Sequence, residues 1–93
     1  MAKVGAYLAE FIGAFVLMYT ILATGSPLAI GAALALLILI TSKISGGHIN
    51  PMVSIVMGSA GKLPINDVLP YILSQILGGM VAFEVYKRYK LLA

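Results

Sequence analysis

The sequence predicts an all-α membrane protein with three transmembrane helices and one re-entrant half-helix. Of its 93 residues, 61% are hydrophobic and only 10% are charged, whereas about a quarter of the residues of a soluble domain are charged. The mean hydropathy is +1.07. A polar turn, Ser45-Gly46-Gly47-His48-Ile49-Asn50-Pro51, interrupts this apolar sequence. Such a turn indicates a pore or a binding site, because unpaired backbone groups are costly in lipid.

The composition also excludes several classes of function. The chain has no cysteine, which excludes disulfides, thiolate catalysis and cysteine-ligated metal sites. The net charge of +3 comes from lysine and arginine at segment ends and not from a basic run, so nucleic-acid binding has no support. We expect no cofactor, no metal site and no catalysed reaction.

The first two predicted crossings are apolar segments joined by a tight turn. The segment from Val4 to about Thr24 is apolar apart from Glu10 and a few hydroxyls. At about 1.5 Å per residue it is long enough to cross a hydrocarbon core of about 30 Å. It is too long for a signal peptide, and further hydrophobic segments follow it. After the turn Thr24-Gly25-Ser26-Pro27, a second crossing is expected from Leu28 to about Ser42.

A helix too short to cross the membrane is predicted after the polar turn. Asn50 is a favourable N-cap, Pro51 is a favourable first helical residue, and an apolar run continues to about Ser59. A helix of about nine residues is about 13 Å long, roughly half of the hydrocarbon thickness. The segment of about residues 45–60 is therefore expected to enter and leave the membrane on one face.

The third crossing is predicted from Val68 to Tyr86, within a helix of about residues 67–87. Asn66 or Asp67 is expected to cap it, and Lys87-Arg88-Tyr89-Lys90 is typical of a membrane interface. Small residues recur at a spacing of four on all three crossings, which favours close helix packing: Gly5, Ala9 and Gly13; Gly31 and Ala35; Gly78 and Ala82.

Together these motifs resemble the aquaporin and glycerol-facilitator family, the major intrinsic proteins. The resemblance rests on Ala9-Glu10-Phe11, on Ile44 to Val53, and on Asp67 to Pro70 followed by Ser74-Gln75 and Gly78-Gly79. It implies half of the aquaporin fold, because family members carry two such halves with opposite topologies in one chain. No second Asn-Pro occurs and no internal repeat fits in 93 residues, so residues 1–93 are expected to form a single half-unit.

The resemblance also implies roles for single residues. Asn50, Pro51 and Met52 take the place of the family's Asn-Pro-Ala triplet, and Asn50 would direct its amide donors into the pore. Glu10 would accept hydrogen bonds from the backbone of the re-entrant loop, and Gln75 would bond to another helix or to the loop. The carbonyls of four loop residues would line the approach to the pore motif: Gly46, Gly47, His48 and Ile49. The side chain of His48 either lines the pore mouth or packs beside the turn.

Two departures from the family pattern concern selectivity. Met52 replaces the usual alanine where two half-helices would touch, and its side chain is bulkier and more flexible. Val53 stands where the family's second half carries a filter arginine. The other filter positions fall at Ile30 from one copy and at Ile38 and Gly47 from the other. The constriction is expected to be apolar, which removes a charge barrier but can obstruct water by dewetting.

A complete pore of this type needs two copies of the chain, one inverted relative to the other. The Lys and Arg residues are balanced between the two faces of the membrane, so neither orientation is favoured: Lys3, Lys43 and Lys62 lie with the N-terminus, and Lys87, Arg88 and Lys90 with the C-terminus. We therefore expect a dual-topology homodimer in lipid, and the resemblance suggests four such dimers as a higher assembly.

The expected function of this multi-pass membrane protein is passive conduction of water, or of glycerol or another small neutral solute, with weaker proton exclusion than a filter arginine gives. Two other classes stay open. A small proton-coupled multidrug transporter would use a membrane carboxylate such as Glu10, but such proteins have four full crossings and no Gly-Gly-His-Ile-Asn-Pro turn. A membrane packing or junction protein would use the same fold without an open pore.

Overall fold

The computed structural model describes residues 2–89, which form four helices: α1 (Ala2–Thr24), α2 (Pro27–Ser45), α3 (Pro51–Ser59) and α4 (Ile65–Tyr89). Three of them, α1, α2 and α4, are long and apolar enough to cross a membrane. The predicted all-α fold with three crossings and one short helix is confirmed. α1 begins two residues earlier than predicted, and α4 extends two residues further at each end. Lys90 of the predicted interfacial flank lies outside the described residues.

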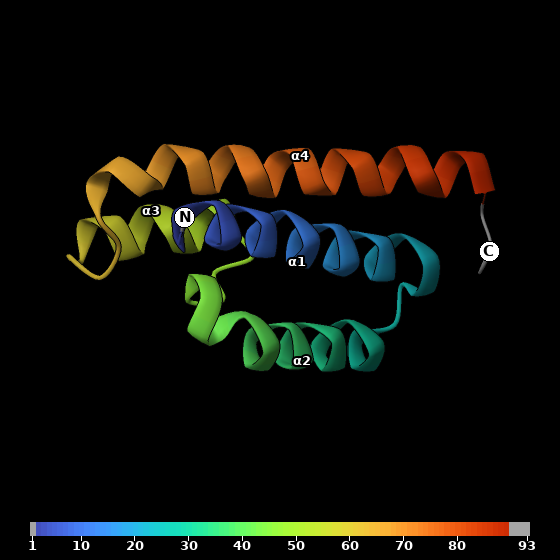
Figure 1. Ribbon diagram of the computed structural model, residues 1–93. Helices are drawn as coiled ribbons and strands as arrows, with labels where there is room; N and C mark the ends of the chain where they lie inside the picture. The colour runs from blue at the N-terminus through green and yellow to red at the C-terminus, as the bar shows by residue number, and fades with distance from the viewer. Residues whose placement is uncertain (1, 90–93) are drawn as a thin grey trace.

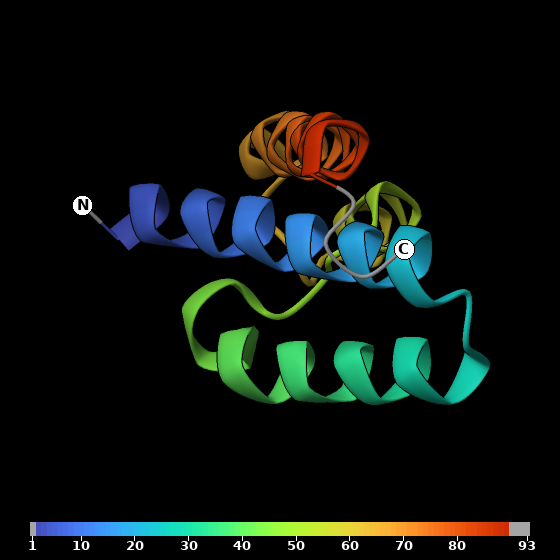
Figure 2. The ribbon, with the colours of Figure 1, turned by 90° about the vertical axis from the view of Figure 1, so that its right-hand side faces the viewer.

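α1 is the central helix, with α4 on one side and α2 on the other (Figure 1, Figure 2). α1 and α4 run in the same direction and α2 runs back, so the start of α1 and the end of α4 lie at opposite ends (Figure 1). The loop after α2 leads to α3, which packs on α4. Because α3 occupies only one end of the bundle, α1 and α4 extend beyond its first residue (Figure 1).

The second crossing is longer than predicted, since α2 ends at Ser45 and not near Ser42. Gly46 follows it with a φ of 91° and donates its backbone N–H to the carbonyl of Ser42. This left-handed C-cap suits glycine, which has no Cβ atom. The hydroxyl of Thr41 donates to the carbonyl of Leu37 at 2.7 Å, so a buried polar side chain is accommodated within the last turns of the helix.

The predicted caps of the third crossing are wrong, because α4 begins at Ile65, before Asn66 and Asp67. Asp67 lies in the first turn and is 6% exposed. Its carboxylate accepts the hydroxyl of Tyr7 at 2.8 Å and lies 3.1 Å from Nζ of Lys3. The side chain that was expected to cap α4 therefore joins the start of α4 to the start of α1.

α1 and α4 approach closely at Gly78. A Cβ atom on Gly78 would collide with the backbone carbonyl oxygen of Phe11. Ala82, one turn further along α4, is completely buried. The predicted packing role of the small residues is thus confirmed for Gly78 and Ala82. At Gly5 and Gly31 a Cβ atom would meet nothing within 4 Å in the described chain, so these two glycines make no close helix contact within one copy.

Candidate functional site

The loop of residues 46–50 follows an unusual backbone path from α2 to α3. Gly46, Gly47 and Ile49 have positive φ angles of 91°, 65° and 64°. Glycine adopts this conformation readily, but a β-branched residue rarely does. Ile49 is only 3% exposed, and its side chain occupies the place where a Cβ atom on Gly13 would lie. The missing side chain at Gly13 therefore gives Ile49 room in its strained conformation.

Glu10 of α1 is completely buried and holds this loop through its carboxylate. Oε2 accepts the hydroxyl of Ser45 at 2.6 Å and the backbone N–H of His48 at 3.1 Å. Oε1 accepts the backbone N–H of Ile49 at 2.7 Å and the side-chain amide of Gln75 at 2.7 Å. These donors compensate for the burial of the carboxylate. The structure thus brings Glu10, Gln75 and the loop backbone together.

A buried polar network surrounds the same loop. His48 Nδ1 lies 2.8 Å from Oγ of Ser54, to which Gln75 also donates, at 2.9 Å. The hydroxyl of Tyr71 donates to the carbonyl of Ser45 at 2.7 Å, which satisfies a free acceptor at the end of α2. His48 is 7% exposed and its ring centre lies 5.2 Å from that of Tyr71. In the single chain, His48 therefore packs beside the turn.

Ser54 and Tyr71 were not predicted as members of this network. Ser54 is completely buried one helical turn after Asn50. The spacing of residues along α4 could have indicated Tyr71, because it lies four residues before Gln75 and so on the same face of the helix. The buried residues of α4 recur every three or four positions: Asp67, Tyr71, Gln75, Gly78 and Ala82.

Within residues 2–89, no group of three or more His, Asp or Glu residues is placed to hold a metal ion.

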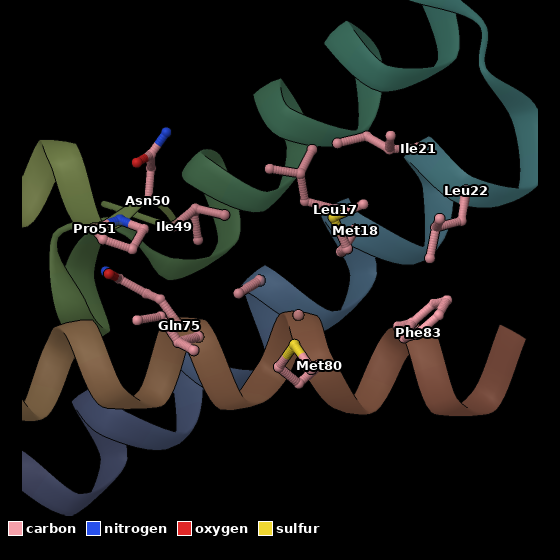
Figure 3. Close-up of a pocket in the computed structure, with 13 residues that line it drawn as sticks. Leu17, Met18, Ile21, Leu22, Ile49, Asn50, Pro51, Gln75, Met80 and Phe83 are labelled. Carbon is pink, nitrogen blue, oxygen red and sulfur yellow. The ribbon is translucent and has the colours of Figure 1, made fainter.

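Asn50 is the N-cap of the half-helix and uses only its side-chain oxygen for this cap. Its Oδ1 accepts the backbone N–H of Met52 at 2.8 Å, and Pro51 occupies the first helical position. The Asn50 residue is exposed, and its amide points away from α4 and Gln75 (Figure 3). The N-terminus of α3 carries a partial positive charge. Amide donors and a positive helix end therefore lie together between the crossings, beside a Met52 that is 62% exposed.

The predicted filter positions fall into separate places in one copy. A Cβ atom on Gly47 would lie 3.3 Å from Cα of Ile38, so these two positions are neighbours. The same Cβ atom would lie 3.2 Å from Oγ1 of Thr41, a polar group that was not predicted there. Ile30 is eight residues before Ile38 on α2, about 12 Å away along the helix, and Val53 lies on α3.

An apolar groove, here called the α1–α4 groove, begins at the first residue of α3 (Figure 3). Its walls are formed by α1 between Ala14 and Leu22 and by α4 between Gln75 and Phe83, and its volume is about 420 Å³. Ile49, Asn50 and Pro51 also line it. Oε1 of Gln75 is the one buried side-chain polar atom without a hydrogen-bond partner in the described part of the chain.

Several known proteins are similar to this chain in sequence. The family model for major intrinsic proteins matches residues 23–90. The chain is 38% identical to the glycerol uptake facilitator protein-like 6 of Lactiplantibacillus plantarum, with 89% of the chain and 43% of that relative covered. It is 35% identical to aquaporin Z of Photorhabdus laumondii and 37% identical to aquaporin Z of Brucella melitensis, with 83% of the chain and 40% of each relative covered. No solved structure gives a significant match.

The chain therefore spans 40 to 43% of the length of these curated relatives. Its three apolar crossings and the family match together make it an integral membrane protein. The helix order, with a short helix between the second and third crossings, is that of half of the aquaporin fold. The resemblance noted in the sequence is confirmed, and the chain belongs to the major intrinsic protein family.

Proposed function

We propose that this chain forms a passive transmembrane channel for water, with small neutral solutes such as glycerol as further substrates. The observation that carries the proposal is the half-helix α3, which is capped by Asn50, begins at Pro51 between the crossings and follows a loop held by Glu10. The N-terminus of a helix carries roughly half a positive charge, which repels cations. Asn50 adds amide donors that can bond to water. The relatives are named a glycerol uptake facilitator and aquaporins.

The proposed pore needs two inverted copies, because residues 2–89 supply one half-helix. The charges at both ends of the bundle support insertion in both orientations. Lys3 lies 3.1 Å from Asp67 at one end, and Lys87 lies 3.1 Å from Glu84 at the other. A chain with balanced basic ends lacks a strong orientation signal. Assembly of four such dimers is the next level that the family resemblance suggests.

The constriction of the proposed pore is apolar and occurs once near each end. It is formed by Ile30 from one copy and by Ile38, Gly47 and Val53 from the other, and the adjacency of Ile38 and Gly47 supports this grouping. No fixed cation is present among these side chains. Less polar solutes should therefore pass more easily than through a filter with arginine, and protons should be excluded less strictly.

The arrangement around Glu10 argues against a proton-coupled transporter. Its carboxylate is completely buried and accepts hydrogen bonds from Ser45, His48, Ile49 and Gln75. A carboxylate that exchanges protons with solvent needs access to water, whereas these donors all come from the protein. Glu10 is therefore assigned a structural role in the loop.

Osmotic shrinkage of liposomes that contain the chain tests the channel. Vesicles with the unaltered chain should shrink at least about tenfold faster than empty vesicles, and glycerol should enter them. Asn50→Asp keeps an oxygen that can accept the backbone N–H of Met52 but replaces the amide donor by a negative charge, so cation leakage should rise while the fold persists. Asn66→Asp makes the same chemical change at an exposed position of α4 and should behave like the unaltered chain.

The other classes of function predict different results in the same vesicles. No flux of any solute above empty vesicles would refute the channel and favour a packing protein, whose closed interface the bulky Met52 would help to form. Substrate-driven proton flux that Glu10→Gln abolishes would favour a transporter. Labelling that found one terminus always on the same face would refute the inverted dimer.

A further inference from the structure

The apolar surface that this chain offers to lipid is short from one membrane face to the other. On α4 it lies between a charged level at Asp67 and a charged level at Glu84. On α2 it lies between the turn that ends at Ser26 and the exposed Lys43. Each stretch covers 17 steps along a helix, about 25 Å at about 1.5 Å per residue. A typical hydrocarbon core is about 30 Å thick.

The level at Glu84 is fixed by exposed charges. Glu84 lies seven residues, about two turns, after Leu77, so the two side chains share one face of α4. Leu77 is 56% exposed and does not line the α1–α4 groove, so this face is turned toward lipid. Nζ of Lys87 lies 3.1 Å from the carboxylate of Glu84 and 5.0 Å from the ring centre of Phe83, so it is directed back along α4. Charges are costly in hydrocarbon, so this pair marks the start of the headgroup region.

The level at Asp67 is fixed in the same way on the other membrane face. Nζ of Lys3 lies 3.1 Å from Oδ1 of Asp67, and the Lys3 side chain is 60% exposed. A lysine can extend its ammonium group several ångströms toward water, but here the carboxylate holds it at the level of Asp67. An exposed ammonium group belongs in the headgroup region, which therefore reaches Asp67. The two ends of α4 thus define the same thickness as α2.

We propose that the lipid-facing surface of this chain fits a bilayer whose hydrocarbon core is about 25 Å thick, that is, phospholipids with short acyl chains. In a core of about 30 Å, either the bilayer thins around the chain or one charged level enters the hydrocarbon. Tilt of the helices would shorten the apolar span further and so would not relieve this mismatch. The inference rests on the three crossings and not on the channel, and it predicts that the chain is enriched in thinner membranes.

Competition between lipids tests the match. The chain has no tryptophan, so Leu77→Trp places a single fluorescent reporter near the middle of the lipid-facing side of α4. This reporter chain is reconstituted in mixtures of a phosphatidylcholine with brominated chains, which quench tryptophan, and unbrominated phosphatidylcholines with hydrocarbon cores of about 20, 25, 30 or 35 Å. The relative lipid-binding constant should be highest for the core of about 25 Å and at least about twofold lower for the core of about 35 Å.

Variants at Glu84 and Lys87 test the cause of the match. In the reporter chain, Glu84→Leu with Lys87→Leu extends the apolar face of α4 by one turn to Arg88, so the best core should thicken toward about 30 Å. Glu84→Gln with Lys87→Gln removes the same charges but keeps polar groups, so its optimum should stay at about 25 Å. Both pairs replace exposed side chains, and circular dichroism checks the helices.

Two results would overturn the inference. One is a highest binding constant at about 30 Å or more for the reporter chain. The other is the same optimum for the leucine and glutamine variants, which would mean that Glu84 and Lys87 do not set the level of the headgroups. Quenching needs no flux, so neither result bears on whether the chain conducts water.

Discussion

The side-chain amide of Gln75 in α4 donates to Oε1 of Glu10 in α1 at 2.7 Å, across 65 positions of sequence. The same carboxylate accepts the backbone N–H groups of His48 and Ile49. One side chain thus joins two parallel crossings to the loop that begins α3. Water is not available in lipid to satisfy these N–H groups, so the position of the half-helix depends on Glu10.

Glu10→Gln should lower the free energy of unfolding by about 2–6 kcal/mol, because two buried donors lose their acceptor and each unpaired donor costs about 1–3 kcal/mol. Glutamine keeps one oxygen acceptor and has an NH₂ group in place of the other. If the NH₂ group replaces Oε2, it faces the donors of Ser45 and His48, and if it replaces Oε1, it faces those of Ile49 and Gln75. Unfolding by sodium dodecyl sulfate in mixed micelles, followed by circular dichroism, measures the change.

The control for Glu10→Gln is Glu84→Gln. Glu84 has a 48% exposed side chain and pairs with Lys87 at the end of α4. Exposed ion pairs contribute about 0–1 kcal/mol, so this substitution should change stability little. Equal losses in the two variants would contradict the role of Glu10 in holding the loop.

Gly78→Ala should destabilise the chain by about 1–3 kcal/mol, as overpacking of a close contact does. The new Cβ atom would collide with the backbone of Phe11, which cannot move away without separating α1 from α4. Gly79→Ala is the matched control on the next residue, where the nearest atom is Cγ of Met18 at 3.9 Å. The same unfolding measurement should leave Gly79→Ala at or above the stability of the unaltered chain, and a similar loss in both variants would show that Gly78 is not a close contact.

Tyr71→Phe should cost about 1–3 kcal/mol, because it leaves the buried carbonyl of Ser45 at the end of α2 without its donor. Tyr19→Phe removes a hydroxyl that makes no hydrogen bond to the described residues and should leave stability nearly unchanged. Amide hydrogen exchange of the 46–50 loop should also accelerate in Tyr71→Phe alone. Unchanged exchange there would mean that the loop does not depend on this bond.

The parts of the fold that follow local rules could be predicted from the sequence. Apolar segment length gave the three crossings, and Asn50 with Pro51 gave the start of α3, since capping depends on neighbouring residues. The end of α2 was missed because it depends on the left-handed conformation of Gly46. The role of Asp67 was missed because its partner Tyr7 lies 60 positions away.

The candidate site was predictable only in part, for the same reason. Glu10 was expected as a support of the loop because a carboxylate in a membrane segment needs donors. The positive φ of Ile49 was not expected, because this conformation is possible only where Gly13 of another helix leaves room. Ser54 has no sequence feature that distinguishes it from other serines, and only its contacts with His48 and Gln75 reveal its role.

Val53→Arg should lower the glycerol permeability of liposomes that contain the chain by about tenfold, equivalent to about 1.4 kcal/mol, and should also reduce proton leakage. Val53 lies on α3, and the constriction proposed above places it where the family resemblance implies a filter arginine. A guanidinium there narrows the proposed constriction, repels protons and favours solutes that can accept several hydrogen bonds. Stopped-flow light scattering under glycerol and sucrose gradients, with a pH-sensitive dye inside the vesicles, measures both fluxes. Val53→Met adds length without charge, so an equal decrease with methionine would show that bulk and not charge limits glycerol at this position.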